Sequence, residues 1–184
     1  MNRAQLPNAI TILRMVLALP LLWLLAKAHY QAALALALLA GATDLLDGFL
    51  AKRFGWQSVL GGILDPIADK LLLSVCFIGL WSSQQLPTWL VAVVIGRDLV
   101  VGLGALAFWQ VTGALQPAPT GMSKAATLSQ LVLVALVLAH LAGVDLLQAW
   151  VQPLMLAMAA ATLVSGLDYV LRYTLRAWRE RGTR

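Results

Sequence analysis

Long apolar stretches alternate with short polar or Gly/Pro-containing breaks along the whole chain. Each stretch is close to the roughly 20 residues that a helix needs to cross the hydrocarbon core of a bilayer. The stretches cover residues 9–26, 31–51, 60–81, 87–111, 123–141 and 149–171. This pattern predicts an all-α, polytopic membrane bundle of six transmembrane helices. We expect the first stretch to be a mature helix, because no small-residue cleavage site of a signal peptide follows its apolar core.

The composition supports a membrane protein. Of the 184 residues, 61% are hydrophobic and only 11% are charged, which excludes a soluble domain of ordinary composition. The chain shows no repeat, low-complexity tract or long linker, so we expect one domain over residues 1–184 with a basic cytoplasmic tail at 172–184. The single cysteine, Cys76, excludes an intrachain disulfide.

Lysine and arginine are unevenly distributed over the breaks. One set of breaks holds Arg3, Lys52, Arg53, Lys124 and the five arginines of the tail, whereas the opposite set holds only Lys27. By the positive-inside rule both termini are predicted to be cytoplasmic, in agreement with an even number of spans. The net charge of +5 is then interpreted as a tail lying against anionic headgroups rather than as a nucleic-acid surface.

Four carboxylates gather in one short part of this apolar chain. They are Asp44, Asp47, Asp65 and Asp69, half of the eight acidic residues. Spacings of three and four residues place each pair on one helix face. Asp44 is expected roughly 10 Å before the end of its helix and Asp69 roughly 13 Å after the start of the next, so all four would lie at similar depth near the cytoplasmic surface.

Four carboxylates so close to hydrocarbon need positive charge beside them, because each one costs several kcal/mol there. Oxygen ligands without nearby histidine or cysteine suit two divalent cations, Mg²⁺ or Mn²⁺. Two such ions are a known arrangement for displacement at phosphorus, and one carboxylate could serve as general base. The small residues Gly48, Ala51 and Gly61 would allow close approach, and Lys52 and Arg53 would suit a diphosphate at the membrane surface.

These residues resemble the CDP-alcohol phosphatidyltransferase family. Its pattern D-x-x-D-G-x-x-A-R, then G-x-x-x-D-x-x-x-D after eight or nine residues, is matched at seven positions: Asp44, Asp47, Gly48, Ala51, Gly61, Asp65 and Asp69. Lys52 stands where the family has arginine, which keeps the charge but loses the bidentate fork; Arg53 is next to it. The segment from Pro7 to Arg14, with Asn8 and Thr11, looks like the opening of the phosphatidylglycerophosphate synthases and cardiolipin synthases of this family.

The resemblance implies a role for each matched residue. Asp44, Asp47, Asp65 and Asp69 would be metal ligands with Asp69 as the base, and Gly48, Ala51, Lys52, Arg53 and Gly61 would border the CDP group. The substrate would be CDP-diacylglycerol, whose phosphatidyl group would pass to an acceptor hydroxyl with release of CMP. We then expect an integral protein of the bacterial inner membrane with its active site facing the cytoplasm; the sequence leaves a homodimer open.

Arg97 and Lys124 are the candidate acceptor-binding residues. Gly96-Arg97-Asp98 and Ser123-Lys124-Ala-Ala126-Thr127 look more like the mitochondrial-type cardiolipin synthases than like the phosphatidylglycerophosphate synthases, which usually have a second lysine where Ala126 stands. A pocket with fewer cations favours phosphatidylglycerol as acceptor, with glycerol 3-phosphate as the alternative. Each cation also has a simpler interpretation: Arg97 in an ion pair with Asp98 or other helices, and Lys124 as a positive-inside residue.

Two other classes of function were weighed against an enzyme. An ion or metal transporter would spread its acids along the membrane normal or repeat them in a second half, and this chain does neither. A scaffold would leave the acidic cluster unexplained. Asp168 and Arg172, four residues apart, are predicted to form an ordinary helix-end salt bridge.

Overall fold

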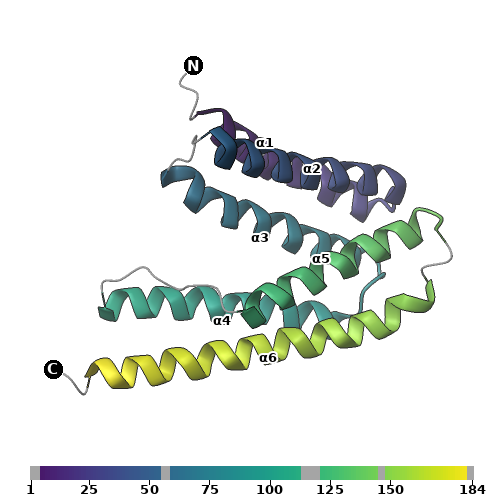
Figure 1. Cartoon of the computed structure of the whole chain (residues 1–184). Helices are drawn as coiled ribbons and strands as arrows, with labels where there is room; N and C mark the ends of the chain where they lie inside the picture. Colours follow the sequence, from purple (N-terminus) through teal and green to yellow (C-terminus); the bar gives the residue numbers. More distant parts are fainter. Residues whose placement is uncertain (1–4, 55–58, 113–120, 145–147, 182–184) are drawn as a thin grey trace. The chain divides into compact units, whose positions relative to one another are not determined.

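The computed structural model describes residues 5–54, 59–112, 121–144 and 148–181, and these residues form helices and short turns at helix ends (Figure 1). The helices are α1 (Gln5–Ala26), α2 (Tyr30–Phe54), α3 (Val59–Ser82), α4 (Thr88–Thr112), α5 (Gly121–Leu141) and α6 (Gln148–Arg181). Each contains nearly all of one predicted stretch, and the all-α prediction is confirmed for the described residues. The helix α6 runs about ten residues beyond its predicted end.

Four segments of the described residues are long and apolar enough to cross a membrane. They are Ala9–Ala26 in α1, Thr88–Ala107 in α4, Gly121–Leu141 in α5 and Gln148–Arg172 in α6. In α2 a shorter apolar segment, Tyr30–Leu46, contains Asp44 near its end, and α3 carries Asp65, Asp69 and Lys70 in its first half. Six transmembrane helices with cytoplasmic termini therefore stay a prediction.

The chain divides into two compact units, which we describe separately. The first contains α1, α2, α3 and residues 134–147 with the end of α5. Within it α1 packs against both α2 and α3 through buried alanine and leucine side chains such as Ala18, Leu21 and Leu25. The approach of α1 and α3 is close at Gly79, where an added Cβ would lie 2.6 Å from Cδ1 of Leu25.

The second unit contains α4, residues 121–133 of α5 and α6. Here α4 packs against α6, and apolar side chains such as Leu90, Val94 and Met158 are buried. A polar contact joins α5 to α6 inside this unit: Nε2 of Gln130 donates to Oγ1 of Thr162 at 3.1 Å, and both side chains are buried. Hydrogen bonds of this kind hold helices together where no water competes for them.

Three helices end in the same left-handed cap. After α1 the residue Ala28 has φ 58°, after α3 Gln84 has φ 61°, and after α5 Gly143 has φ 108°. In each case the following amide donates back to a carbonyl five residues earlier, as from His29 to Leu24 at 2.9 Å. This bond satisfies a carbonyl that the helix end would otherwise leave open. The caps turn the chain sharply and explain how α1 can be followed so soon by α2.

Candidate active site

Two polar side chains of α1 reach the acidic residues of the first unit. Thr11 and Arg14 are three residues apart, so they share one helix face, and their exposed fractions are 0% and 1%. The Thr11 hydroxyl donates to Oδ1 of Asp65 at 2.7 Å. The Arg14 guanidinium donates to Oδ1 of Asp69 at 3.1 Å and forms an ion pair with Asp44. Thus α1 contacts three of the four predicted metal ligands.

Asp44 of α2 and Asp69 of α3 both contact the same nitrogen of Arg14. Oδ1 of Asp44 lies 2.5 Å from Nη1 of Arg14, and Oδ1 of Asp69 lies 3.1 Å from the same nitrogen. Asp44 lies roughly 15 Å before the end of α2, and Asp69 roughly 15 Å after the start of α3. The two acids therefore lie equally far from the facing ends of α2 and α3, and both helices extend slightly further than the sequence suggested.

The carboxylates are more open to solvent than the cation that joins them. The Asp69 side chain is 53% exposed and the Asp44 side chain 38%, whereas Arg14 is buried. Asp65 is partly buried beside Thr11. A guanidinium stays protonated even when buried, so Arg14 brings a permanent positive charge to the inner side of these acids.

The other predicted site residues lie on the same two helices. Gly48 on α2 is partly exposed, and an added Cβ would meet nothing within 4 Å, so no described atom closes in on it. Gly61 on α3 is buried, and Arg53 near the end of α2 is exposed. The side chains of Asp47, Ala51 and Lys52 lie outside the described part of the structure. The four-carboxylate cage therefore stays a prediction.

The donor set suits a divalent metal ion. Oxygens of Asp44 and Asp69 already converge on one cationic nitrogen, and hard carboxylate oxygens are the ligands that Mg²⁺ and Mn²⁺ prefer. Among the described side chains, no three acidic, histidine or cysteine groups lie close enough together to hold an ion at once. The convergence of two carboxylates supports the chemistry of such a site, and its complete ligand set stays a prediction.

Arg97 of α4 is the centre of a polar cluster in the second unit. Its guanidinium donates to Asp98 at 2.8 Å, to Oγ of Ser123 on α5 at 2.7 Å and to Oγ of Ser165 on α6 at 2.8 Å. Arg97 is 7% exposed, so these bonds compensate for its removal from water. The ion pair with Asp98 considered from the sequence is thus present. Lys124, one residue after Ser123, is exposed.

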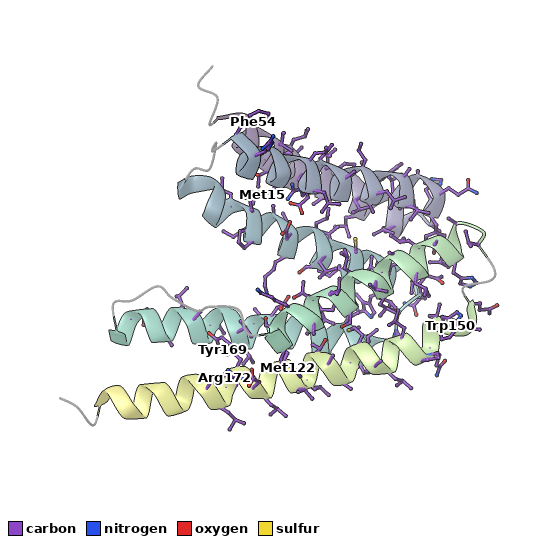
Figure 2. The ribbon with its side chains drawn as sticks, in the orientation of Figure 1. Met15, Phe54, Met122, Trp150, Tyr169 and Arg172 are labelled. Carbon is purple, nitrogen blue, oxygen red and sulfur yellow. The ribbon has the colours of Figure 1, made fainter. Side chains whose placement is uncertain are left out.

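The predicted salt bridge on α6 is present, but it does not lie at a helix end, because α6 continues to Arg181. Nε of Arg172 lies 2.6 Å from Oδ1 of Asp168, one helical turn earlier. Figure 2 shows Tyr169 and Arg172 on the same helix. Arg172 is 62% exposed, so the pair lies near solvent and contributes little to stability.

Arg14 and Thr11 were not among the site residues predicted from the sequence. Both belong to the segment that resembles the family's opening, but spacing within α1 does not reveal which helix its polar face contacts. The available signal was Arg14 itself, because an ionisable residue inside an apolar span is a candidate functional residue. The same rule selected Arg97.

Comparison with known proteins places these residues in a wider group. A family model described as CDP-alcohol phosphatidyltransferase matches residues 4–165. The cardiolipin synthase (CMP-forming) of Rattus norvegicus is 36% identical over 124 residues, which cover 67% of this chain and 40% of the rat protein. The chloroplastic CDP-diacylglycerol–glycerol-3-phosphate 3-phosphatidyltransferase 1 of Oryza sativa subsp. japonica is 32% identical over 189 residues, covering 92% of this chain and 57% of the rice protein.

A bacterial relative is matched over most of its length. The CDP-diacylglycerol–glycerol-3-phosphate 3-phosphatidyltransferase of Pseudomonas fluorescens is 35% identical over 187 residues, which cover 95% of this chain and 90% of that protein. The chain thus spans about half the length of the rat and rice relatives and nearly all of the bacterial one. The relative named as a cardiolipin synthase and those named as glycerol-3-phosphate 3-phosphatidyltransferases are thus similar to this chain to nearly the same degree.

Proposed function

Because the chain belongs to the CDP-alcohol phosphatidyltransferase family, we propose that it transfers the phosphatidyl group of CDP-diacylglycerol to an acceptor hydroxyl and releases CMP. The observation that carries this proposal is the meeting of Asp44 from α2 and Asp69 from α3 at one cationic atom. These carboxylates come together from separate helices, and such a pair can hold divalent cations against the oxygens of a diphosphate. The family match gives a transporter no support.

The transfer step requires a base and a leaving group. In the proposed step the acceptor oxygen attacks the β-phosphorus, which is esterified to the lipid, and the bond from this phosphorus to the bridging oxygen breaks as CMP leaves. Asp69, which is half exposed and lies beside Arg14, receives the hydroxyl proton. When bound, divalent ions would stabilise the negative charge that develops on the diphosphate. Asp44, Asp47, Asp65 and Asp69 are their proposed ligands.

The nucleotide is assigned to the start of α3 and the second half of α2. Gly48 and Gly61 lie one residue after Asp47 and four before Asp65 on these two helices, and the space around Gly48 is open. We assign Ala51, Lys52 and Arg53 to the same surface, with the two cations facing the phosphates. Lys52 offers a point charge where the family usually has a planar fork, so Arg53 would supply the bidentate contact.

The acceptor is assigned to Arg97 and Lys124, with phosphatidylglycerol preferred to glycerol 3-phosphate. Arg97 already shares its charge with Asp98 and gives hydrogen bonds to two serines. Ala126, one turn after Met122 on α5, is fully buried and brings no cation. A phosphodiester carries one negative charge and a phosphomonoester nearly two, so a cluster with little spare charge suits the phosphodiester better.

The proposed setting is the bilayer. The membrane-embedded substrate, the four apolar spans and the basic residues near Arg53 and Lys124 support an integral membrane protein whose active site faces the cytoplasm of a bacterial cell. We propose that residues 1–184 act as one domain.

The test is CMP release by the purified chain from CDP-diacylglycerol, with phosphatidylglycerol, glycerol 3-phosphate, serine and inositol phosphate offered in turn. CMP release with phosphatidylglycerol, and less with glycerol 3-phosphate, is the expected result. Release with glycerol 3-phosphate alone would overturn the acceptor assignment but keep the reaction class. No CMP release with any acceptor would overturn the proposed function.

A further inference from the structure

Nη1 of Arg14 contacts one oxygen each of Asp44 and Asp69, two acids that the proposed function assigns to a divalent ion. We propose that Arg14 is a built-in cation of the carboxylate site: it competes with the divalent ion for these two acids and so sets how tightly the ion is held. This inference rests on the proposed function, because it takes both acids as metal ligands. It adds a residue from α1, which the sequence motif of α2 and α3 does not contain.

One oxygen of each carboxylate contacts Arg14 and would also be wanted by a divalent ion. Oδ1 of Asp44 and Oδ1 of Asp69 are the atoms that contact Nη1 of Arg14, at 2.5 and 3.1 Å. An oxygen that accepts a charge-assisted hydrogen bond at such a distance has less electron density to offer a metal ion. Any ion that takes these oxygens must draw them away from Arg14 or share them with it.

The burial of Arg14 explains why its effect should be strong. The side chain is 1% exposed, and a guanidinium does not lose its proton in a protein. Away from water the charge is weakly screened, so the repulsion between Arg14 and an arriving divalent ion acts through an effective dielectric far below that of bulk water. The same charge stabilises the ion-free site, in which Asp44 and Asp69 would otherwise repel each other.

A purely organising role for Arg14 predicts the opposite result. If the guanidinium served only to bring Asp44 and Asp69 together, its removal would scatter the ligands and weaken ion binding. If it competes with the ion, its removal strengthens ion binding once the protein is folded. The sign of the change in affinity therefore separates the two roles, and it does so without any measurement of catalysis.

The experiment measures binding of Mn²⁺ alone to the purified full chain by electron paramagnetic resonance. The variant Arg14→Gln keeps a hydrogen-bond donor and removes the charge. Arg172→Gln is the matched control, because it also removes one positive charge, from an exposed pair on α6. We expect Arg14→Gln to bind Mn²⁺ on the order of ten-fold more tightly than the natural chain, and Arg172→Gln to bind it equally well.

A second variant keeps the inference testable if Arg14→Gln does not fold. Arg14→Lys retains the charge but offers a single ammonium in place of a fork that serves two acids, so it should bind Mn²⁺ about two- to three-fold more tightly. In a thermal scan, Mn²⁺ should raise the unfolding temperature of either variant more than that of the natural chain. Both variants, like the natural chain, are checked for helix content by circular dichroism.

The outcomes distinguish this inference from the function on which it rests. Unchanged or weaker Mn²⁺ binding by the folded Arg14 variants, with normal binding by the natural chain, would overturn the competition and leave the metal site intact. No Mn²⁺ binding by the natural chain would overturn the metal site of the proposed function and the inference with it.

Discussion

Thr11 and Arg14 are buried polar side chains of the apolar helix α1, and both contact acids of other helices. Burying a hydroxyl and a guanidinium is costly unless each has good partners. Thr11 has Asp65 at 2.7 Å, and Arg14 has Asp69 and Asp44. The arrangement of the carboxylates thus depends on a helix that carries none of them.

Thr11→Val tests this dependence at the residue scale. Valine fills the same volume but donates no hydrogen bond, so Asp65 loses a partner and the free energy of unfolding should fall by about 1.5–3 kcal/mol, the usual range for a bond to a charged group. Denaturant unfolding in detergent micelles measures the change.

The matched control is Thr43→Val on α2. Its hydroxyl donates to the carbonyl of Ala40 in its own helix at 2.8 Å, so the loss should stay within about 0.5 kcal/mol. Equal losses in the two variants would show that the contact with Asp65 does not stabilise the fold.

The acids could be identified from the sequence, whereas their cation could not. Asp44, Asp65 and Asp69 stand out because charge is rare in an apolar chain and their spacing fits helix faces. The contact of Arg14 with Asp69 joins residues 55 positions apart, and one sequence without related sequences does not specify which helices meet. An ionisable residue inside an apolar span is a functional candidate, and this rule selects Arg14 as well as Arg97. Arg14 could therefore have been predicted as a candidate from the sequence, although its contacts could not.

At the scale of the helices, α1 and α3 approach each other closely at Gly79. An added Cβ at Gly79 would lie 2.7 Å from Cβ of Leu25, an atom that cannot turn aside without moving the helix backbone. Small residues permit this kind of approach between membrane helices. The contact sets the distance between α1 and α3 at the opposite end of the pair from Thr11 and Asp65.

Gly79→Ala should therefore destabilise the protein by about 1–3 kcal/mol, in spite of the better helix propensity of alanine. The control is Gly102→Ala on α4, where nothing lies within 4 Å of the added Cβ, and there a neutral effect or a gain of up to about 1 kcal/mol is expected. Thermal unfolding of both variants in the same detergent compares them. A Gly79→Ala protein as stable as Gly102→Ala would contradict the close approach.

The positions of the helices were largely predictable and their caps were not. Apolar stretches of about 20 residues mark a membrane helix strongly, so the six predicted segments agree with the six described helices to within a few residues at most ends. The end of α6 is the exception, because its polar last turns carry no apolar signal. Ala28 and Gln84 adopt positive φ although neither is glycine, and the residue types at these positions do not predict a left-handed cap.

At the scale of the whole molecule, the proposed location of the active site depends on which side of the membrane each helix end faces. The positive-inside rule predicts that the carboxylate site faces the cytoplasm. Arg53 and Lys124 lie in one set of breaks, whereas the opposite set holds only Lys27. The polar turn after α3, which contains Gln85, is then predicted to face outward.

Labelling of introduced cysteines tests the orientation. After Cys76→Ala removes the natural thiol, Gln85→Cys should react with a membrane-impermeant maleimide in intact bacterial cells, and Arg53→Cys should react only after the cells are opened. Both positions are exposed, so access rather than burial decides the result. Labelling of Arg53→Cys in intact cells would contradict a cytoplasmic site.

The most direct measurement of the central claim is CMP release from CDP-diacylglycerol by the natural chain and by Asp69→Asn, with Mn²⁺ and acceptor present. Asparagine has nearly the shape of aspartate but cannot take the acceptor proton, and general bases typically contribute 10²–10⁴-fold to a rate. We predict that Asp69→Asn folds with the helix content of the natural chain and releases CMP at least about 100-fold more slowly. A folded Asp69→Asn protein that releases CMP at a rate close to that of the natural chain would contradict the account.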